Sequence, residues 1–233
     1  MWQIDGKRYW AERNVVVPGD NLPEMFWNAV AMRGDKTLFR QKKYGLWQTL
    51  SWNEVGAIVR EAGMGLLELG FEVGETTSIL GNTRQEWLFS DLAVLSCGGI
   101  SSGIYPTDAA SQVEYLIQDS NSVVLFVEDD EQLDKALEVR ERLPLLTKII
   151  VFDMEGLRDL DDPQVMSLDA LRALGRLHLQ TQPTLLDERS AAVKPEDLAI
   201  LVYTSGTTGK PKGAMHSHAG LVYTARGYNT LAT

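Results

Sequence analysis

Short strand-like runs alternate with amphipathic helical segments along most of this chain, and this alternation restricts its fold. The runs 76–80, 99–105, 122–127 and 148–152 consist largely of apolar, β-branched and small residues. The segments between them have the spacing of amphipathic helices. Strands that alternate with helices of about 10–15 residues favour βαβ units. The sequence therefore predicts an α/β fold with a mainly parallel sheet and helices on both faces.

A hairpin and a capped helix are predicted before the first of these strands. The runs 38–40 and 46–50 flank a turn that contains glycine, as in a β-hairpin. Ser51 and Glu54 then have the spacing of a capping box, in which each side chain satisfies a free backbone N–H group. A helix is expected from there to about Leu69.

Two more helices are predicted from polar residues that resemble helix caps. The run Asn82–Gln85 repeats the capping pattern and predicts a helix through Cys97. Thr107 or Asp108 is expected to cap a further helix that ends near Gln118.

A change of composition suggests where the first compact unit ends. Five carboxylates lie in 153–162, and the stretch 180–195 is polar and contains two prolines. We expect an amino-terminal subdomain over residues 1–180, a linker-like segment over 181–197, and the start of the next part over 198–233.

The composition is that of an acidic globular protein. A net charge of −10 argues against nucleic acid as a partner, because phosphate backbones need clustered cations. The one cysteine, Cys97, lies in an apolar run and is expected in the core. The first residues lack an apolar stretch of signal-peptide length, and no segment approaches about 20 apolar residues. We expect a cytoplasmic protein, with peripheral contact with a membrane left open.

The histidines and tryptophans are expected to be structural. Two residues apart on a presumed helix, His216 and His218 would lie on different faces, which favours capping or surface positions. His178 lies among leucines and is expected at the surface. The following are interpreted as packing anchors: Trp10, Trp27, Trp47, Trp52 and Trp87.

The run Tyr203–Gly213 has the composition of a phosphate-binding loop. It contains three glycines and two lysines among hydroxyl side chains, and it follows the apolar stretch 198–202. Glycines let backbone N–H groups approach an anion, hydroxyls donate to phosphate oxygens, and lysines supply positive charge. No carboxylate follows Asp197, so residues 198–233 carry +3. From His216 onward a helix is expected.

Two common nucleotide-binding motifs are excluded at this loop. The P-loop of NTPases has a glycine five residues before its Gly-Lys pair and Ser or Thr after it. Here those positions are Thr204 and Pro211. The dinucleotide-binding pattern G-x-G-x-x-G is also absent from the loop.

The loop instead resembles the phosphate-binding signature of the adenylate-forming (AMP-binding) superfamily, which includes acyl-CoA synthetases, luciferases and peptide-synthetase adenylation domains. All eleven positions of Tyr203–Gly213 fit, and Met215 and His218 fit the usual continuation. Over roughly residues 22–233 the chain is most similar to the amino-terminal part of long-chain fatty acid–CoA ligases. The upstream blocks that carry this similarity are 82–87, 91–100, 105–107 and 112–120.

The resemblance implies a two-step ligase reaction. The carboxylate of a fatty acid attacks the α-phosphorus of ATP, with Mg²⁺ present, and the thiol of CoA then displaces AMP. By resemblance the ATP phosphates would contact Thr204, Ser205, Gly206, Thr207, Thr208, Gly209 and Lys212. Thr204 would also touch Mg²⁺. Lys212 is preferred to Lys210 because the family pattern has Pro-Lys-Gly at that point.

The chain ends about 20 residues after the signature, whereas enzymes of this superfamily are usually about twice as long or more. No catalytic residue is therefore assigned, and we expect a fragment that is inactive by itself, binds ATP weakly or not at all, and self-associates. Other adenylate-forming enzymes remain alternatives: a short-chain or aromatic acid–CoA ligase, or a peptide-synthetase adenylation domain. A non-catalytic nucleotide-binding or interaction module is the alternative from a different class.

Overall fold

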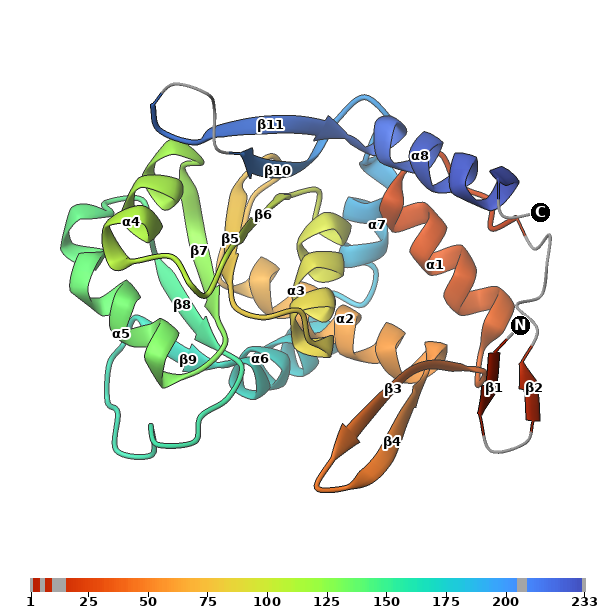
Figure 1. The fold of residues 1–233 in the computed structure, drawn as a ribbon, viewed down its shortest axis with the longest axis horizontal. Helices are drawn as coiled ribbons and strands as arrows, with labels where there is room; N and C mark the ends of the chain where they lie inside the picture. The colour runs from red at the N-terminus through yellow and green to blue at the C-terminus, as the bar shows by residue number, and fades with distance from the viewer. Residues whose placement is uncertain (1, 5–6, 10–15, 205–208, 232–233) are drawn as a thin grey trace.

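A seven-stranded sheet forms the centre of the molecule in a computed structural model, which describes residues 2–4, 7–9, 16–204 and 209–231 (Figure 1). Its strands are β5 (Thr76–Leu80), β6 (Ile100–Ile104), β7 (Ser122–Val127), β8 (Lys148–Val151), β9 (Val165–Ser167), β10 (Leu198–Thr204) and β11 (Lys212–Ser217). Their order is β11-β10-β6-β5-β7-β8-β9. Every neighbouring pair is parallel except β10 with β11.

Helices cover both faces of this sheet, as the sequence predicts. They are α1 (Leu22–Arg33), α2 (Trp52–Glu68), α3 (Gln85–Ser96), α4 (Ala110–Asp119), α5 (Asp130–Val139), α6 (Leu168–Thr181), α7 (Leu185–Ala192) and α8 (His218–Leu231), with a 3₁₀ turn at Arg140–Arg142. Helices α2, α3 and α6 contribute to one buried cluster, and α4 and α5 contribute to the other. The predicted fold class is confirmed.

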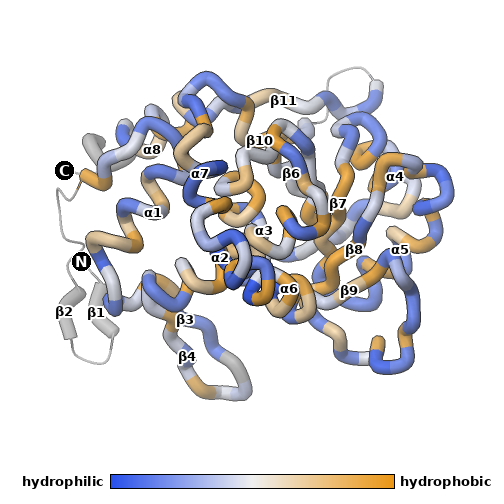
Figure 2. The backbone as a smooth tube through the Cα atoms, turned by 180° about the vertical axis from the view of Figure 1, so that it is seen from behind, coloured by the Kyte–Doolittle hydropathy of each residue, from blue (hydrophilic) through white to orange (hydrophobic). Residues whose placement is uncertain are grey.

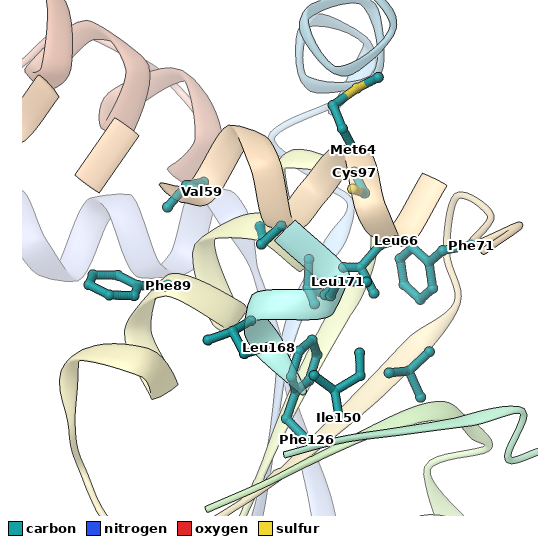
Figure 3. Close-up of a cluster of buried hydrophobic side chains, with 14 of the residues drawn as sticks. Val59, Met64, Leu66, Phe71, Phe89, Cys97, Phe126, Ile150, Leu168 and Leu171 are labelled. Carbon is teal, nitrogen blue, oxygen red and sulfur yellow. The ribbon is translucent and has the colours of Figure 1, made fainter. Parts of the chain in front are cut away.

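Side chains along β7 point alternately into two hydrophobic cores, one on each face of the sheet. Val124 and Phe126 belong to the cluster with α2, α3 and α6, part of which Figure 3 shows. Leu125 and Val127 belong to the cluster with α4 and α5. Successive side chains on a strand point to opposite faces, so an unbroken apolar run is what a doubly covered strand requires. In Figure 2 the strands in the middle of the sheet are accordingly among the more hydrophobic parts of the chain.

Two small hairpins lie outside the main sheet. One pairs β1 (Trp2–Ile4) with β2 (Lys7–Tyr9). The other pairs β3 (Thr37–Lys43) with β4 (Leu46–Ser51) and confirms the predicted hairpin. After it, Ser51 and Glu54 make the predicted capping box at the start of α2.

The other two predicted caps are wrong. Helix α3 begins at Gln85, and Asn82 instead donates from its backbone and side chain to the Glu128 carboxylate, at 2.6 and 3.0 Å. These bonds tie the end of β5 to the end of β7. Helix α4 begins after Ala109, which makes no side-chain cap bond.

The segment predicted to be linker-like, 181–197, contains helix α7, on which Leu186 is fully buried. Strand β10 then pairs with β6, so residues 198–204 extend the same sheet. Tertiary contacts therefore order a stretch whose polarity and prolines favour a linker. The division of the chain into 1–180 and a part that starts at 198 remains a prediction.

None of the helices in the described ranges combines the length and the apolar character needed to span a membrane.

Candidate functional site

The candidate phosphate-binding loop joins two antiparallel strands. Strand β10 enters it at Thr204, and β11 leaves it at Lys212, the residue that pairs with Thr204. The expected helix from His216 is therefore displaced, because α8 begins at His218. Pairing with β11 satisfies the backbone groups along that edge of β10, which a helix would leave unpaired. Backbone donors to an anion would have to come from the loop itself.

The predicted site residues that the structure describes lie at the two ends of this loop. Thr204 and Lys212 are exposed, and as a cross-strand pair their side chains lie on the same face of the hairpin. Gly209 has φ +106°, a conformation that favours glycine. Ser205, Gly206, Thr207 and Thr208 lie outside the described residues.

Two tyrosine hydroxyls join helix α4 to strand β10 and to the residue before β11. The Tyr115 hydroxyl donates to the Pro211 carbonyl oxygen at 2.8 Å. The Tyr203 hydroxyl donates to Asp119 Oδ2 at 2.8 Å. Burial, together with the nearby Asp119 carboxylate, raises the pKa of both phenols, so both remain neutral donors. The Tyr203 hydroxyl is therefore engaged by α4.

The two lysines of the loop lie in different settings. The Lys210 ammonium lies 4.6 Å from the centre of the Tyr115 ring, a cation–π distance. Lys212 lies beside Thr204 on the exposed hairpin face. Because α4 holds Lys210 against an aromatic ring, Lys212 is the better placed of the two to meet a ligand next to Thr204.

Charged side chains at the ends of β5 and β7 are compensated internally. Arg84 Nε lies 2.6 Å from Glu86 Oε2, and Arg84 Nη1 lies 3.5 Å from Glu128 Oε1. Burial opposes ionisation of Glu86, but hydrogen bonds, chiefly from Arg84, bring the pKa of its carboxyl below the usual value. This cluster therefore offers little net charge to an anion, in contrast to the loop.

The histidines agree only in part with the sequence-based expectation. His218 is only 1% exposed, so a surface position is wrong, but its Nδ1 accepts a hydrogen bond at 3.3 Å from the N–H of Leu22, the first residue of α1, which is a capping contact. Burial lowers the pKa of His218. His216 is exposed on β11, and His178 is partly buried beside Glu68.

Cys97 is fully buried, as expected, and burial raises the pKa of its thiol to about 12. Neither of two pockets found in the described part of the chain, of about 280 and 500 Å³, is lined by the hairpin. Within the same residues, His, Cys, Asp and Glu side chains do not gather in threes as a metal site would require.

The fold and the site together define the class of protein. It is an α/β protein with a parallel sheet and a glycine-rich hairpin loop at the carboxyl ends of its strands. A comparison with known families matches residues 26–233 to the family described as AMP-binding enzyme. The chain belongs to this family, which confirms the resemblance to adenylate-forming enzymes.

The most similar curated proteins include two long-chain-fatty-acid–CoA ligases. FadD15 of Mycobacterium bovis is 33% identical over 89% of this chain and 33% of its own length. ACSBG1 of Homo sapiens is 31% identical over 87% of this chain and 27% of its own length. The chain thus spans about a third or less of the curated relatives that it matches.

Solved structures of adenylate-forming enzymes have the same fold. An anthranilate CoA ligase, AuaEII, in complex with anthranoyl-AMP superimposes with a TM-score of 0.73 at 26% identity, over 88% of this chain and 36% of that chain. Acetoacetyl-CoA synthetase from Streptomyces lividans gives a TM-score of 0.70 at 22% identity, over 87% of this chain and 31% of that chain.

Proposed function

We propose that this chain supplies the ATP-phosphate-binding part of a long-chain fatty acid–CoA ligase. The observation that supports this most is the β10–β11 hairpin, which presents Thr204 and Lys212 side by side in a stretch without carboxylates after Asp197. The names of the similar curated proteins support the substrate class.

The donors at the hairpin fit a polyphosphate anion. A lysine, threonine hydroxyls and the backbone N–H groups of a glycine-rich loop supply positive charge and hydrogen-bond donors. The first step brings a carboxylate to an already anionic nucleotide, so neutralising phosphate charge lowers the barrier. Lys212 is the residue to which we assign that task.

The loop offers fewer ligands for Mg²⁺ than for the ATP phosphates. This ion prefers six oxygen ligands and is usually held by one or two carboxylates, substrate phosphates and water. Thr204 would add a single hydroxyl oxygen to a Mg²⁺ ion that the ATP phosphates hold. CoA is proposed as the second substrate, and this part of the chain offers no assignment for its binding.

A specific observation favours keeping aromatic acids as an alternative substrate class. The anthranilate CoA ligase superimposes with a TM-score of 0.73 at 26% identity. We therefore propose an assay with three acids, palmitate, acetate and anthranilate, on the protein that contains this chain, with ATP and CoA present. Thioester formation fastest with palmitate is expected, whereas a preference for anthranilate would replace the proposed substrate class.

The first prediction concerns the two lysines. In that protein we expect Lys212→Ala to lower kcat/KM for ATP by about 10²–10³, as loss of a preorganised charged donor does. Lys210→Ala serves as the matched control, and a loss below about tenfold is expected because its ammonium lies over Tyr115. Equal losses in the two variants would contradict the assignment of Lys212.

The chain alone is proposed to lack adenylation activity. Exchange of labelled pyrophosphate into ATP, measured with palmitate present and absent, tests this directly. Carboxylate-dependent exchange by residues 1–233 would overturn it.

A further inference from the structure

The β3–β4 hairpin projects from the body of the molecule, as both views show (Figures 1 and 2). Its base is held by the core, since the Phe39 ring meets Phe89 edge-on at 6.0 Å between ring centres and Leu50 packs against the same cluster. Its tip is exposed. Tyr44, Leu46 and Trp47 are 91%, 72% and 67% exposed.

The register of the hairpin places cations next to an aromatic ring. Tyr44 and Gly45 form a two-residue turn, with φ of +50° and +81°. Lys42 then pairs with Trp47, and Arg40 pairs with Thr49. Because paired residues share a face and alternate residues do as well, one face of the ribbon carries the indole together with both cations.

The net charge of the hairpin is also opposite in sign to that of the rest of the chain. Residues 37–51 contain three Lys or Arg residues and no Asp or Glu, a net charge of +3. The chain carries −10 in total, so the remaining residues carry −13. An anionic partner would therefore attract this hairpin and repel most of the remaining surface.

An anionic lipid surface matches this chemistry better than a groove on a protein does. Trp and Tyr rings settle at the level of lipid headgroups, and lysine side chains reach from there to phosphates. Basic residues beside exposed apolar ones give the combination of electrostatic and apolar attraction that interfacial binding needs. A narrow, convex tip can enter a headgroup layer without a complementary cavity.

We propose that the tip of the β3–β4 hairpin, residues 40–47, docks this protein on membranes that contain anionic lipids. The proposal does not depend on the proposed ligase activity. In Figure 1 the hairpin lies at the opposite side of the molecule from strands β10 and β11. Neither ATP nor a fatty acid is needed for its test.

The test is sedimentation of the chain with vesicles of phosphatidylcholine, with or without about 30% phosphatidylserine. Binding only to the vesicles with phosphatidylserine, and its loss at about 0.5 M NaCl, is expected. Lys42→Glu and the double variant Leu46→Ser with Trp47→Ser should each weaken binding about tenfold or more. The matched controls, Lys194→Glu and Leu177→Ser, change exposed residues elsewhere and should bind as the parent chain does.

A dye placed next to the tip, at residue 48, reports the contact directly. Cys97 is fully buried, so a cysteine introduced as Gln48→Cys, an exposed position, can be labelled selectively with an environment-sensitive fluorophore. Its emission should shift to the blue with phosphatidylserine vesicles, whereas the same dye at Glu138→Cys on α5 should not respond.

Three outcomes would overturn the proposal: no binding to phosphatidylserine vesicles, equal binding by folded tip variants, or a shift at Gln48→Cys on raising protein concentration without vesicles. The last would assign the tip to contact with a second copy of this chain. Unchanged circular dichroism and melting temperature of the tip variants are required, so that loss of binding is not loss of fold.

Discussion

Asp91 on α3 is a carboxyl group that the fold buries with little compensation. It is 6% exposed, and its Oδ1 atom has no hydrogen-bond partner among the described residues. Burial raises its pKa to about 6. A folded pKa above the unfolded value means that this group stabilises the fold at low pH, and that the contribution is lost as pH rises through about 6.

The second prediction follows from this loss of stability as the pH rises. Asp91→Asn keeps the shape of the side chain but cannot ionise. Between pH 4 and pH 7 the parent chain should lose up to about 3 kcal/mol of unfolding free energy relative to the variant. Urea unfolding of both proteins across this range measures the difference.

His218 contributes with the opposite sign, because burial lowers its pKa and its contribution is lost as pH falls. Both proteins contain it, so it cancels in the comparison. Parallel stability profiles of parent and variant would contradict a buried, shifted Asp91.

For individual residues, the sequence predicted which side chains form the candidate site but not which side chains hold it in place. Thr204 and Lys212 are assigned through the resemblance of the loop to the phosphate-binding signature of the family. Tyr115 and Asp119 lie about ninety residues earlier, and nothing local connects them with Pro211 and Tyr203. Their one local signal is a spacing of four, which puts them on one face of a helix.

Among the elements, α2 and α6 approach so closely that glycine is required at their crossing, on α6 at Gly175 and on α2 at Gly65. A Cβ atom on Gly175 would lie 1.8 Å from the Glu61 carbonyl oxygen and 2.7 Å from the Gly65 nitrogen. Both are backbone atoms, so no side-chain rotation could relieve the overlap.

The third prediction is that Gly175→Ala destabilises the chain by about 1–3 kcal/mol or more, because the helices must separate. Gly227→Ala on α8 is the matched control. No heavy atom lies within 4 Å of the added methyl group there, and replacing a helical glycine should stabilise by about 0.5–1 kcal/mol. Thermal unfolding compares them, and a neutral Gly175→Ala would contradict the observed crossing.

Elements with a strong local pattern were predictable, and those defined by distant contacts were not. The strand at Ser122–Val127 is apolar on both faces, and Ser51 with Glu54 marks the start of a helix. Strand β11 has no such alternation, and its pairing with β10 determines its conformation. Helix α7 has a polar sequence and is positioned through the buried Leu186.

For the whole molecule, the last elements of the chain each carry an exposed apolar side chain. Val202 on β10, Met215 on β11 and Tyr223 on α8 are 44%, 74% and 81% exposed. Strand β11 is also an edge strand of the sheet, and unpaired strand edges and apolar surface both promote association.

The fourth prediction is that the chain self-associates through this region at high concentration. Changing both Met215 and Tyr223 to Glu should lower the average mass measured by light scattering, because each adds charge to the surface. The tip variant Leu46→Ser with Trp47→Ser should leave it unchanged. A monodisperse monomer at every concentration would contradict the prediction.

The pairing of Thr204 with Lys212 has a consequence for how this protein can change. The two ends of the segment 205–211 are brought together by the β10–β11 ladder and by the bonds with α4. The entropy of closing such a loop depends only weakly on its length. Substitutions and small insertions in the segment can therefore alter ligand recognition at little cost to the free energy of folding. Selection on these residues can then act on ligand binding and catalysis alone.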